Sequence, residues 1–139
     1  MRTKSNILHT VRMLHEENLD VRTVTMGINM LSCSGRDITA TARAIRQLIK
    51  ARASNLVSTC DELTAKYGLP IVNKRIAVSA VSQLLEGHDL SAALTIAQAL
   101  DESAAEAKVD FIGGFTALVH KGMTHGEQVL IESLPMVLS

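Results

Sequence analysis

Two stretches of the chain alternate apolar and polar residues, as β-strands with one buried face do. In the first stretch, Val24, Met26 and Ile28 fall on one face and Gly27 on the other. Because a glycine in mid-strand has no side chain, it either weakens packing or admits a close neighbour. The alternation predicts strands over residues 21–30 and 71–79, and a third, short strand is predicted over residues 109–113, ended by the glycine pair.

Between these stretches, apolar residues recur every three to four positions, which is the spacing of one helix face. Asp37 and Asp89 stand at N-cap positions, and Thr124 with Glu127 fits a capping box. Pro135 is expected to end the last helix, since proline interrupts the backbone hydrogen bonds. The spacing predicts helices over residues 5–18, 37–67, 89–104 and 124–134, and a short helical turn over 80–86.

The helix predicted over residues 37–67 is longer than the sheet it would cover. Unbroken, it would extend about 46 Å at 1.5 Å per residue, whereas strands of this size span roughly 17–34 Å. Its apolar face continues to Leu63 and Tyr67, so part of that face would overhang the sheet. A bend near residues 53–55, where helix propensity is weakest, is the alternative. We expect the overhang to pack on another copy of the chain or on a further part of the same protein.

Helices and strands alternate along the chain, which predicts an α/β fold. Strands joined by helical crossovers lie parallel in one sheet, so we expect a mainly parallel sheet. No repeat, low-complexity tract or linker interrupts the sequence, and residues 1–139 are expected to form a single domain. Leu138 keeps the sequence apolar up to the final Ser139. This favours the N-terminal portion of a longer protein, because chain ends are usually polar.

Composition excludes several classes of protein. With 14 Lys+Arg, 14 Asp+Glu and a formal net charge of +0, the chain lacks the basic surface that nucleic-acid binding needs. One Tyr and two Phe are too few for stacking on bases. No run of 18 apolar residues is present, so no membrane span is expected. Cys33 and Cys60 lack CxxC spacing, which predicts free thiols in a cytoplasmic protein.

Candidate chemistry lies after the strands, because ligands of parallel sheets bind beyond the carboxyl ends of the strands. Gly113 and Gly114 follow the third strand, with Lys121 and a helix N-terminus soon after. Tandem glycines let the backbone approach a ligand, so we expect Gly113 or Gly114 to have a positive φ or to lie against another backbone or a ligand. The lysine and helix N-terminus favour an anion. A structural turn beside a solvated lysine is the alternative. Cys33 follows the first strand and is a candidate reactive thiol, with a small buried thiol as the alternative.

Two adjacent cations lie near the start of the second predicted strand, in the segment Asn73, Lys74 and Arg75. Successive strand residues point to opposite faces, so Lys74 and Arg75 cannot both reach solvent if one face is covered. We expect at least one of them to pair with a carboxylate or with an anionic ligand, a salt bridge at the sheet edge being the structural alternative. The five histidines have no carboxylate at a metal-ligand spacing, so no metal site is expected.

A family resemblance is carried by three segments: residues 16–28, residues 67–76, and residues 109–115 with Lys121 and Gly122. They resemble the PFL family of uncharacterised bacterial and archaeal proteins, whose fold is similar to that of pyruvate formate-lyase. The resemblance extends along essentially the whole chain and implies a glycyl-radical-enzyme-like barrel built from two half-sheets, without implying that enzyme's reaction. Cys33 matches a cysteine position of the family. The resemblance marks these candidate ligand-binding positions: Asn73, Lys74, Arg75, Asp110, Gly113, Gly114 and Lys121.

Two hypotheses of function follow, and neither identifies a catalytic residue or a cofactor. In the first, the chain binds a small anionic metabolite at the strand ends, which requires Gly113, Gly114, Lys121 and Lys74 or Arg75 to converge on one cleft. In the second, the chain is an oligomeric regulatory or assembly module. The resemblance then implies a partner such as an ACT-domain protein, because small ACT-domain proteins are associated with the family.

Overall fold

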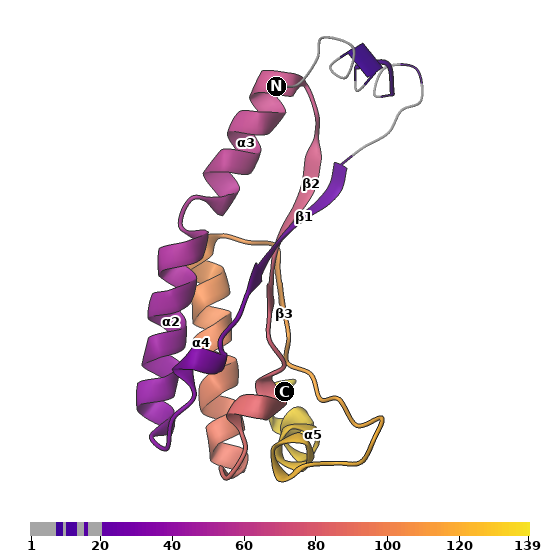
Figure 1. Cartoon of the computed structure of the whole chain (residues 1–139). Helices are drawn as coiled ribbons and strands as arrows, with labels where there is room; N and C mark the ends of the chain where they lie inside the picture. The colour runs from indigo at the N-terminus through magenta and orange to yellow at the C-terminus, as the bar shows by residue number, and fades with distance from the viewer. Residues whose placement is uncertain (1–7, 10, 14–15, 17–20) are drawn as a thin grey trace.

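The computed structural model describes residues 8–9, 11–13, 16 and 21–139. Three parallel strands form one sheet in the order β1-β2-β3 (Figure 1). The strands are β1 (Val21–Ile28), β2 (Ile71–Val78) and β3 (Phe111–Gly113). The α/β class and the parallel sheet predicted from the sequence are confirmed. The described residues form an open sheet, and they show no barrel.

The helices begin at the capping residues that the sequence indicates. Asp37 accepts hydrogen bonds from two backbone amides at the start of its helix, and Asp89 accepts one from Ala92. Thr124 and Glu127 form the predicted capping box. The helices are α2 (Ile38–Ala53), α3 (Leu56–Tyr67), α4 (Leu90–Ala107) and α5 (His125–Val137), with 3₁₀ turns η1 (Leu31–Cys33) and η2 (Val81–Leu84). Of the helix predicted over residues 5–18, residues 8–9, 11–13 and 16 are helical, and the other positions lie outside the described residues.

The prediction of one unbroken helix over residues 37–67 is wrong, because the chain breaks at Ser54 and Asn55 between α2 and α3. Before the break, α2 packs along α4; after it, α3 contacts β2. The two halves therefore meet different neighbours, and the weak helix propensity at the break lets the direction change. The predicted stop is confirmed, since Gly68 ends α3 with a left-handed φ of 67°.

Helix α5 passes the predicted stop at Pro135 and ends at Val137. Proline removes the N–H that would bond the carbonyl four residues earlier, which is Ile131. Because Pro135 lies in the last turn, where several carbonyls lack helical partners anyway, one further missing bond does not end the helix. The position of a proline within a helix therefore decides how strongly it interrupts.

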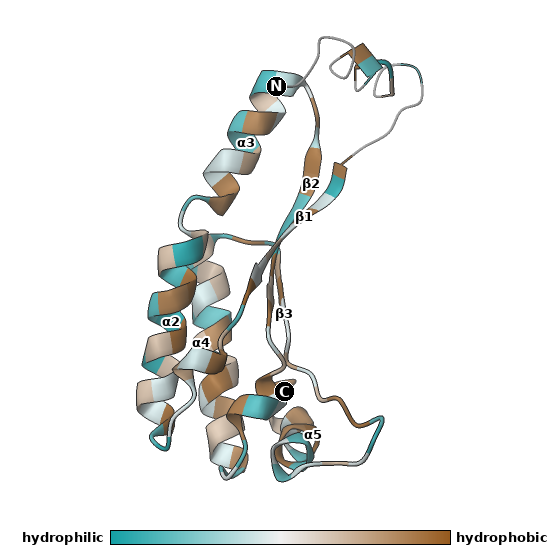
Figure 2. Cartoon of the chain, viewed as in Figure 1, coloured by the Kyte–Doolittle hydropathy of each residue, from teal (hydrophilic) through white to brown (hydrophobic). Residues whose placement is uncertain are grey.

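Helices α2, α3 and α4 lie on the same side of the sheet (Figure 1). Buried apolar residues of these helices form the core with residues of β1, β2 and η2, and Figure 2 shows apolar positions along the strands and helices. Ile76 in β2 is 1% exposed, and Ile45 of α2 and Ile96 of α4 are fully buried. Each such side chain contributes about 1.5–3 kcal/mol by leaving water.

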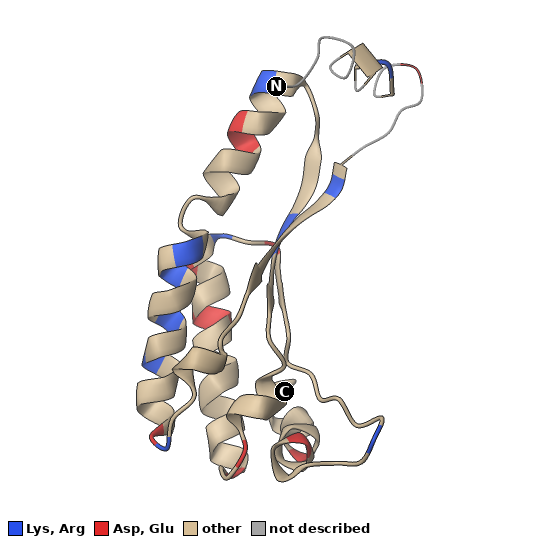
Figure 3. Cartoon of the chain, viewed as in Figure 1, with Lys and Arg blue, Asp and Glu red and all other residues tan. Residues whose placement is uncertain are grey.

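The outer surface of α2 and α4 is charged (Figure 3). Arg46 pairs with Glu102, and Lys50 pairs with Glu106, so two ion pairs join the helices. All four side chains are at least half exposed, and exposed pairs contribute little to stability. No helix in the described part of the chain is long and apolar enough to cross a membrane.

Candidate functional site

The sheet has one face that the helices leave uncovered. Strand residues alternate between faces, and the register pairs Met26 with Ile76 and Ile76 with Ile112 on the helix side. The opposite face, called the open face below, is exposed at several positions, including Thr25, Gly27, Ala77 and Phe111. It comprises Thr23, Thr25, Gly27, Asn73, Arg75, Ala77, Phe111 and Gly113.

The strand register arranges the open face in rows. Thr25 pairs with Arg75, and Arg75 pairs with Phe111, so these three residues form one row across the sheet. The next row toward the carboxyl ends of the strands contains Gly27, Ala77 and Gly113. Larger polar and aromatic side chains therefore border a row with almost no side chains.

Lys74 and Arg75 point to opposite faces, as predicted, and have different partners. Lys74 lies on the helix side, with its Nζ 3.3 Å from Oδ1 of Asp61 in α3. This ion pair confirms that at least one of the two cations pairs with a carboxylate. Arg75 lies on the open face, with its Cζ 5.7 Å from the centroid of the Phe111 ring. Its Nε is buried and has no hydrogen-bond partner among the described residues, where Arg75 also forms no ion pair.

Asn73 and Asp110, two further candidates, make backbone contacts that organise the sheet. The Asn73 side-chain amide donates to the carbonyl oxygen of Arg22 in β1 at 3.2 Å. Oδ2 of Asp110 accepts from the backbone N–H of Lys74 at 2.7 Å, while the Asp110 N–H donates to the Lys74 carbonyl at 2.9 Å. Asp110 thus extends the pairing of β2 and β3 by one position, which accounts for an acidic residue there.

Gly114 has the conformation that the sequence predicts for the glycine pair. Its φ is 126°, and a Cβ there would lie 2.5 Å from the carbonyl oxygen of Val78. The expected positive φ and the close backbone approach are therefore confirmed. Gly113 ends β3, and a Cβ there would lie 3.1 Å from the Phe111 ring. Packing within the chain accounts for both glycines.

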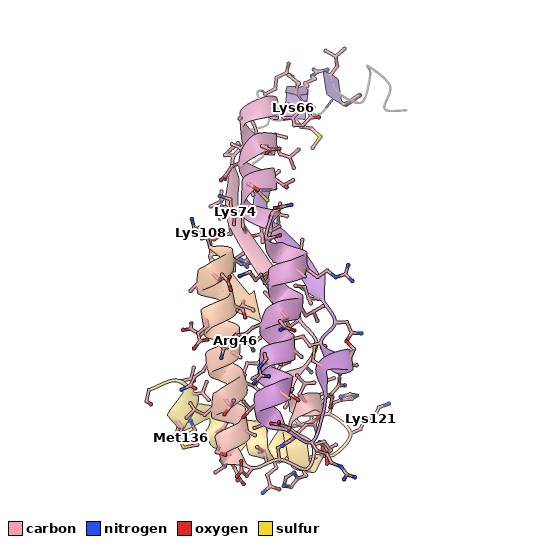
Figure 4. All side chains as sticks on the ribbon, turned by 90° about the vertical axis from the view of Figure 1, so that its left-hand side faces the viewer. Arg46, Lys66, Lys74, Lys108, Lys121 and Met136 are labelled. Carbon is pink, nitrogen blue, oxygen red and sulfur yellow. The ribbon has the colours of Figure 1, made fainter. Side chains whose placement is uncertain are left out.

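Lys121 lies in the loop after β3, far from Lys74 (Figure 4), and the two do not converge on one site. The N-terminus of α5, which was expected to attract an anion, is already occupied by a carboxylate from the same chain. The Gly126 N–H in α5 donates to Oε2 of Glu86 at 3.0 Å. This hydrogen bond is the main reason why the pKa of Glu86 is lowered. Ligand binding by Gly113, Gly114 and Lys121 stays a prediction.

Both cysteines are free thiols, as predicted. Cys33 lies half-buried in η1 and packs against the hydrophobic core. Cys60 lies in the core, 2% exposed, where burial raises the pKa of its thiol and the charge of Lys74 partly opposes the rise. The part of the chain that the structure describes has no group of three or more His, Cys, Asp or Glu residues placed to hold a metal ion.

A pocket of about 400 Å³ lies where β3, α4 and the end of α5 meet. Its lining is mainly apolar, with Gln98 and Asp101 as polar members, and it includes Gly113. Lys74, Arg75 and Lys121 are not among its lining residues. Of the predicted site residues, Gly113 lines this pocket, and the others lie outside its lining.

Sequence reasoning missed two members of the row around Arg75, namely Thr25 and Phe111. Each lies at an alternating strand position, so the face that each occupies could be predicted. Their placement beside Arg75 depends on the strand register, which the alternation of one strand alone does not determine. Gly27 was recognised as a mid-strand position without a side chain, but its pairing with Ala77 could be known only from the strand register.

Comparison with known proteins identifies the family. A family model described as "Uncharacterised ACR (DUF711)" matches residues 12–139. The chain belongs to the DUF711 family. Its relatives include UPF0210 proteins of Desulforamulus reducens, 44% identical over 135 residues, and of Streptococcus pneumoniae, 45% identical over 133 residues. A UPF0210 protein of Desulfovibrio desulfuricans is 43% identical over 139 residues.

The assignment to the PFL family is wrong, because the matches are to DUF711 and UPF0210 proteins and none names a relationship to pyruvate formate-lyase. These DUF711 relatives are longer proteins. The matches cover 96–100% of this chain but 30% of the length of each relative. The names of the relatives state no activity, so function has to be argued from the geometry of this chain.

Proposed function

We propose that this chain contributes a binding surface for a small anion, held by Arg75 on the open face. The observation that carries the proposal is the environment of the guanidinium group. Lys74, the adjacent cation, has Asp61 as its counter-ion, whereas Arg75 has no acidic partner among the described residues. A guanidinium presents paired N–H donors that match carboxylate and phosphate groups.

The composition of the open face supports a ligand there. Parallel sheets are usually covered on both faces, and their strands are then apolar on both. Here the helix side carries residues such as Met26 and Ile76, while the open face carries Thr, Gly, Asn, Arg and Ala. Binding sites are typically lined by apolar and aromatic side chains with a few polar groups among them, and the open face combines Phe111 with Arg75 and Thr25.

Two arginines on neighbouring strands allow a matched test. Arg22 in β1 is exposed and two residues from Val24, so it lies on the helix-side face, opposite to that of Arg75. Acetate and inorganic phosphate would be titrated into the ¹⁵N-labelled chain while the Nε–H signal of each arginine is followed. We expect saturable shifts at Arg75, their loss in Arg75→Gln, and unchanged binding in Arg22→Gln. Equal responses of the two arginines, or no response at Arg75, would refute the proposal.

A second candidate function is self-association, favoured by exposed apolar side chains in the second half of α3 and at the start of β2. Leu63 is 41% exposed, Tyr67 48% and Val72 55%, and clustered exposed apolar residues are typical of interaction surfaces. Light scattering after size-exclusion chromatography tests it. We expect a concentration-dependent mass that returns to the monomer value in the double variant Leu63→Ser with Val72→Thr. A strictly monomeric wild-type chain at high concentration would exclude this function.

A further inference from the structure

The space beside Arg75 has a floor with almost no side chains, formed by Gly27 and Ala77. Gly27 has a φ outside the left-handed region, and a Cβ there would have no atom within 4 Å. Neither the backbone conformation nor packing within the described chain therefore requires a glycine at this position. Its neighbour in the register is Ala77, which is also exposed. Together they leave room directly above the backbone of two adjacent strands.

Phe111 forms one side of this space. Its side chain is 58% exposed although it is a large apolar group. Its ring extends along β3 toward Gly113, reaching 3.1 Å from the position of a Cβ there. The same ring lies 5.7 Å from Cζ of Arg75. An exposed aromatic ring therefore borders both the cation and the bare floor.

The dimensions of the floor fit a flat ring. Neighbouring strands lie about 4.8 Å apart, and residues two apart in a strand are separated by about 6.7 Å. A six-membered ring placed on Gly27 and Ala77 covers this area and meets the side of Phe111. Aromatic rings pair favourably in offset or edge-to-face arrangements at such a border. A bulkier, non-planar body would have a poorer fit to a flat floor with one aromatic side.

The donors next to the floor suit a carboxylate. Thr25 is the register partner of Arg75, so the two residues lie side by side on the same face and the Thr25 hydroxyl group is a further donor in this row. A carboxylate has two oxygen atoms, and both can accept hydrogen bonds from the paired N–H donors of one guanidinium group and from one hydroxyl group. A phosphate has more oxygens and would leave some without a donor from this row.

We propose that the anion bound at Arg75 is an aromatic carboxylate, with its ring on Gly27 and Ala77 and against Phe111. This inference rests on the proposed anion-binding function and adds the chemical class of the ligand. It also gives a role to the glycine in mid-strand that neither the fold nor the backbone conformation requires.

The test compares benzoate, cyclohexanecarboxylate, acetate and inorganic phosphate by NMR titration of the full 139-residue chain. We expect benzoate to bind at least about threefold more tightly than cyclohexanecarboxylate, as one aromatic contact would give. Gly27→Val should weaken benzoate binding more than acetate binding, since the floor contacts the ring rather than the carboxylate. Phe111→Leu, which keeps an apolar side chain, should remove the preference for benzoate.

The outcomes separate the two proposals. Equal affinities for benzoate and cyclohexanecarboxylate, or tighter binding of phosphate, would overturn the aromatic carboxylate and leave Arg75-dependent anion binding intact. Absence of Arg75-dependent binding for all four anions would overturn both. If Gly27→Val unfolds the chain, Phe111→Leu with the same pair of carboxylates still decides the question.

Discussion

The contact between α5 and η2 makes a sharp prediction for Gly126→Ala. Gly126 is buried in the first turn of α5, and a Cβ there would lie 2.2 Å from the carbonyl oxygen of Ser82 and 2.9 Å from the backbone nitrogen of Glu86. Ordinary contact begins at 3.4 Å, so the two backbones would have to separate by about 1.2 Å. Neither neighbouring atom belongs to a side chain that could rotate away.

The magnitude follows from the cost of overpacking. Forcing an extra carbon into a packed contact typically costs about 1–3 kcal/mol, and separation of α5 also loosens its buried residues Val129 and Leu130. For a chain of this length, 1 kcal/mol corresponds to roughly 3–4 °C in Tm. We therefore expect Gly126→Ala to lower the free energy of unfolding by about 1–3 kcal/mol and the Tm by about 3–12 °C.

Gly27→Ala is the matched control, because the same added carbon meets open space there. We expect Gly27→Ala to leave the free energy of unfolding unchanged or to raise it by about 0.4–1 kcal/mol, because alanine lowers the conformational entropy of the unfolded chain. Urea and thermal unfolding followed by circular dichroism measure both variants. If Gly126→Ala melted at the wild-type temperature, the close approach of α5 to η2 would not hold in solution and the reasoning would be refuted.

Three further results are expected. Glu86→Gln should lower the free energy of unfolding near neutral pH but not in acid. A carboxylate whose pKa is lowered in the folded chain stabilises the fold at pH values above its ordinary pKa of 4.5, and this stabilisation is lost as the pH falls through the folded-state pKa. Urea unfolding curves measured across this pH range check it. Cys33 should react with a thiol reagent in the native chain before Cys60, whose buried thiol has a raised pKa, and mass spectrometry of the labelled peptides identifies the order. Glu127→Ala should cost more than the roughly 1 kcal/mol of Thr124→Ala in urea unfolding, because it leaves two backbone amides without their acceptor.

Much of the fold could be predicted because local patterns determined it. The alternation of Val24, Met26 and Ile28 identified the buried face of β1, and Asp37 and Asp89 marked helix starts. These features depend on residues close together in sequence. The parallel sheet then followed from the alternation of strands with helices.

The features that sequence reasoning missed depend on contacts between distant segments. The break at Ser54 and Asn55 was visible as weak propensity, but choosing it over an overhanging helix required knowing that α2 packs on α4 and α3 on β2. The candidate site was likewise only partly predictable. The prediction that Lys74 or Arg75 pairs with a carboxylate is confirmed, whereas the identity of Asp61 as the partner of Lys74 depended on tertiary structure.

The helix break also divides the chain into parts that should open independently. Helix α2 buries residues along its whole length against α4, whereas the buried residues of α3, Leu56 and Cys60, lie in its first half, with Leu63 and Tyr67 exposed beyond them. Segments with few buried contacts exchange their amide protons through local opening, at a lower free energy than global unfolding. The second half of α3 should therefore exchange with deuterium well before α2, although the two helices are separated by only two residues.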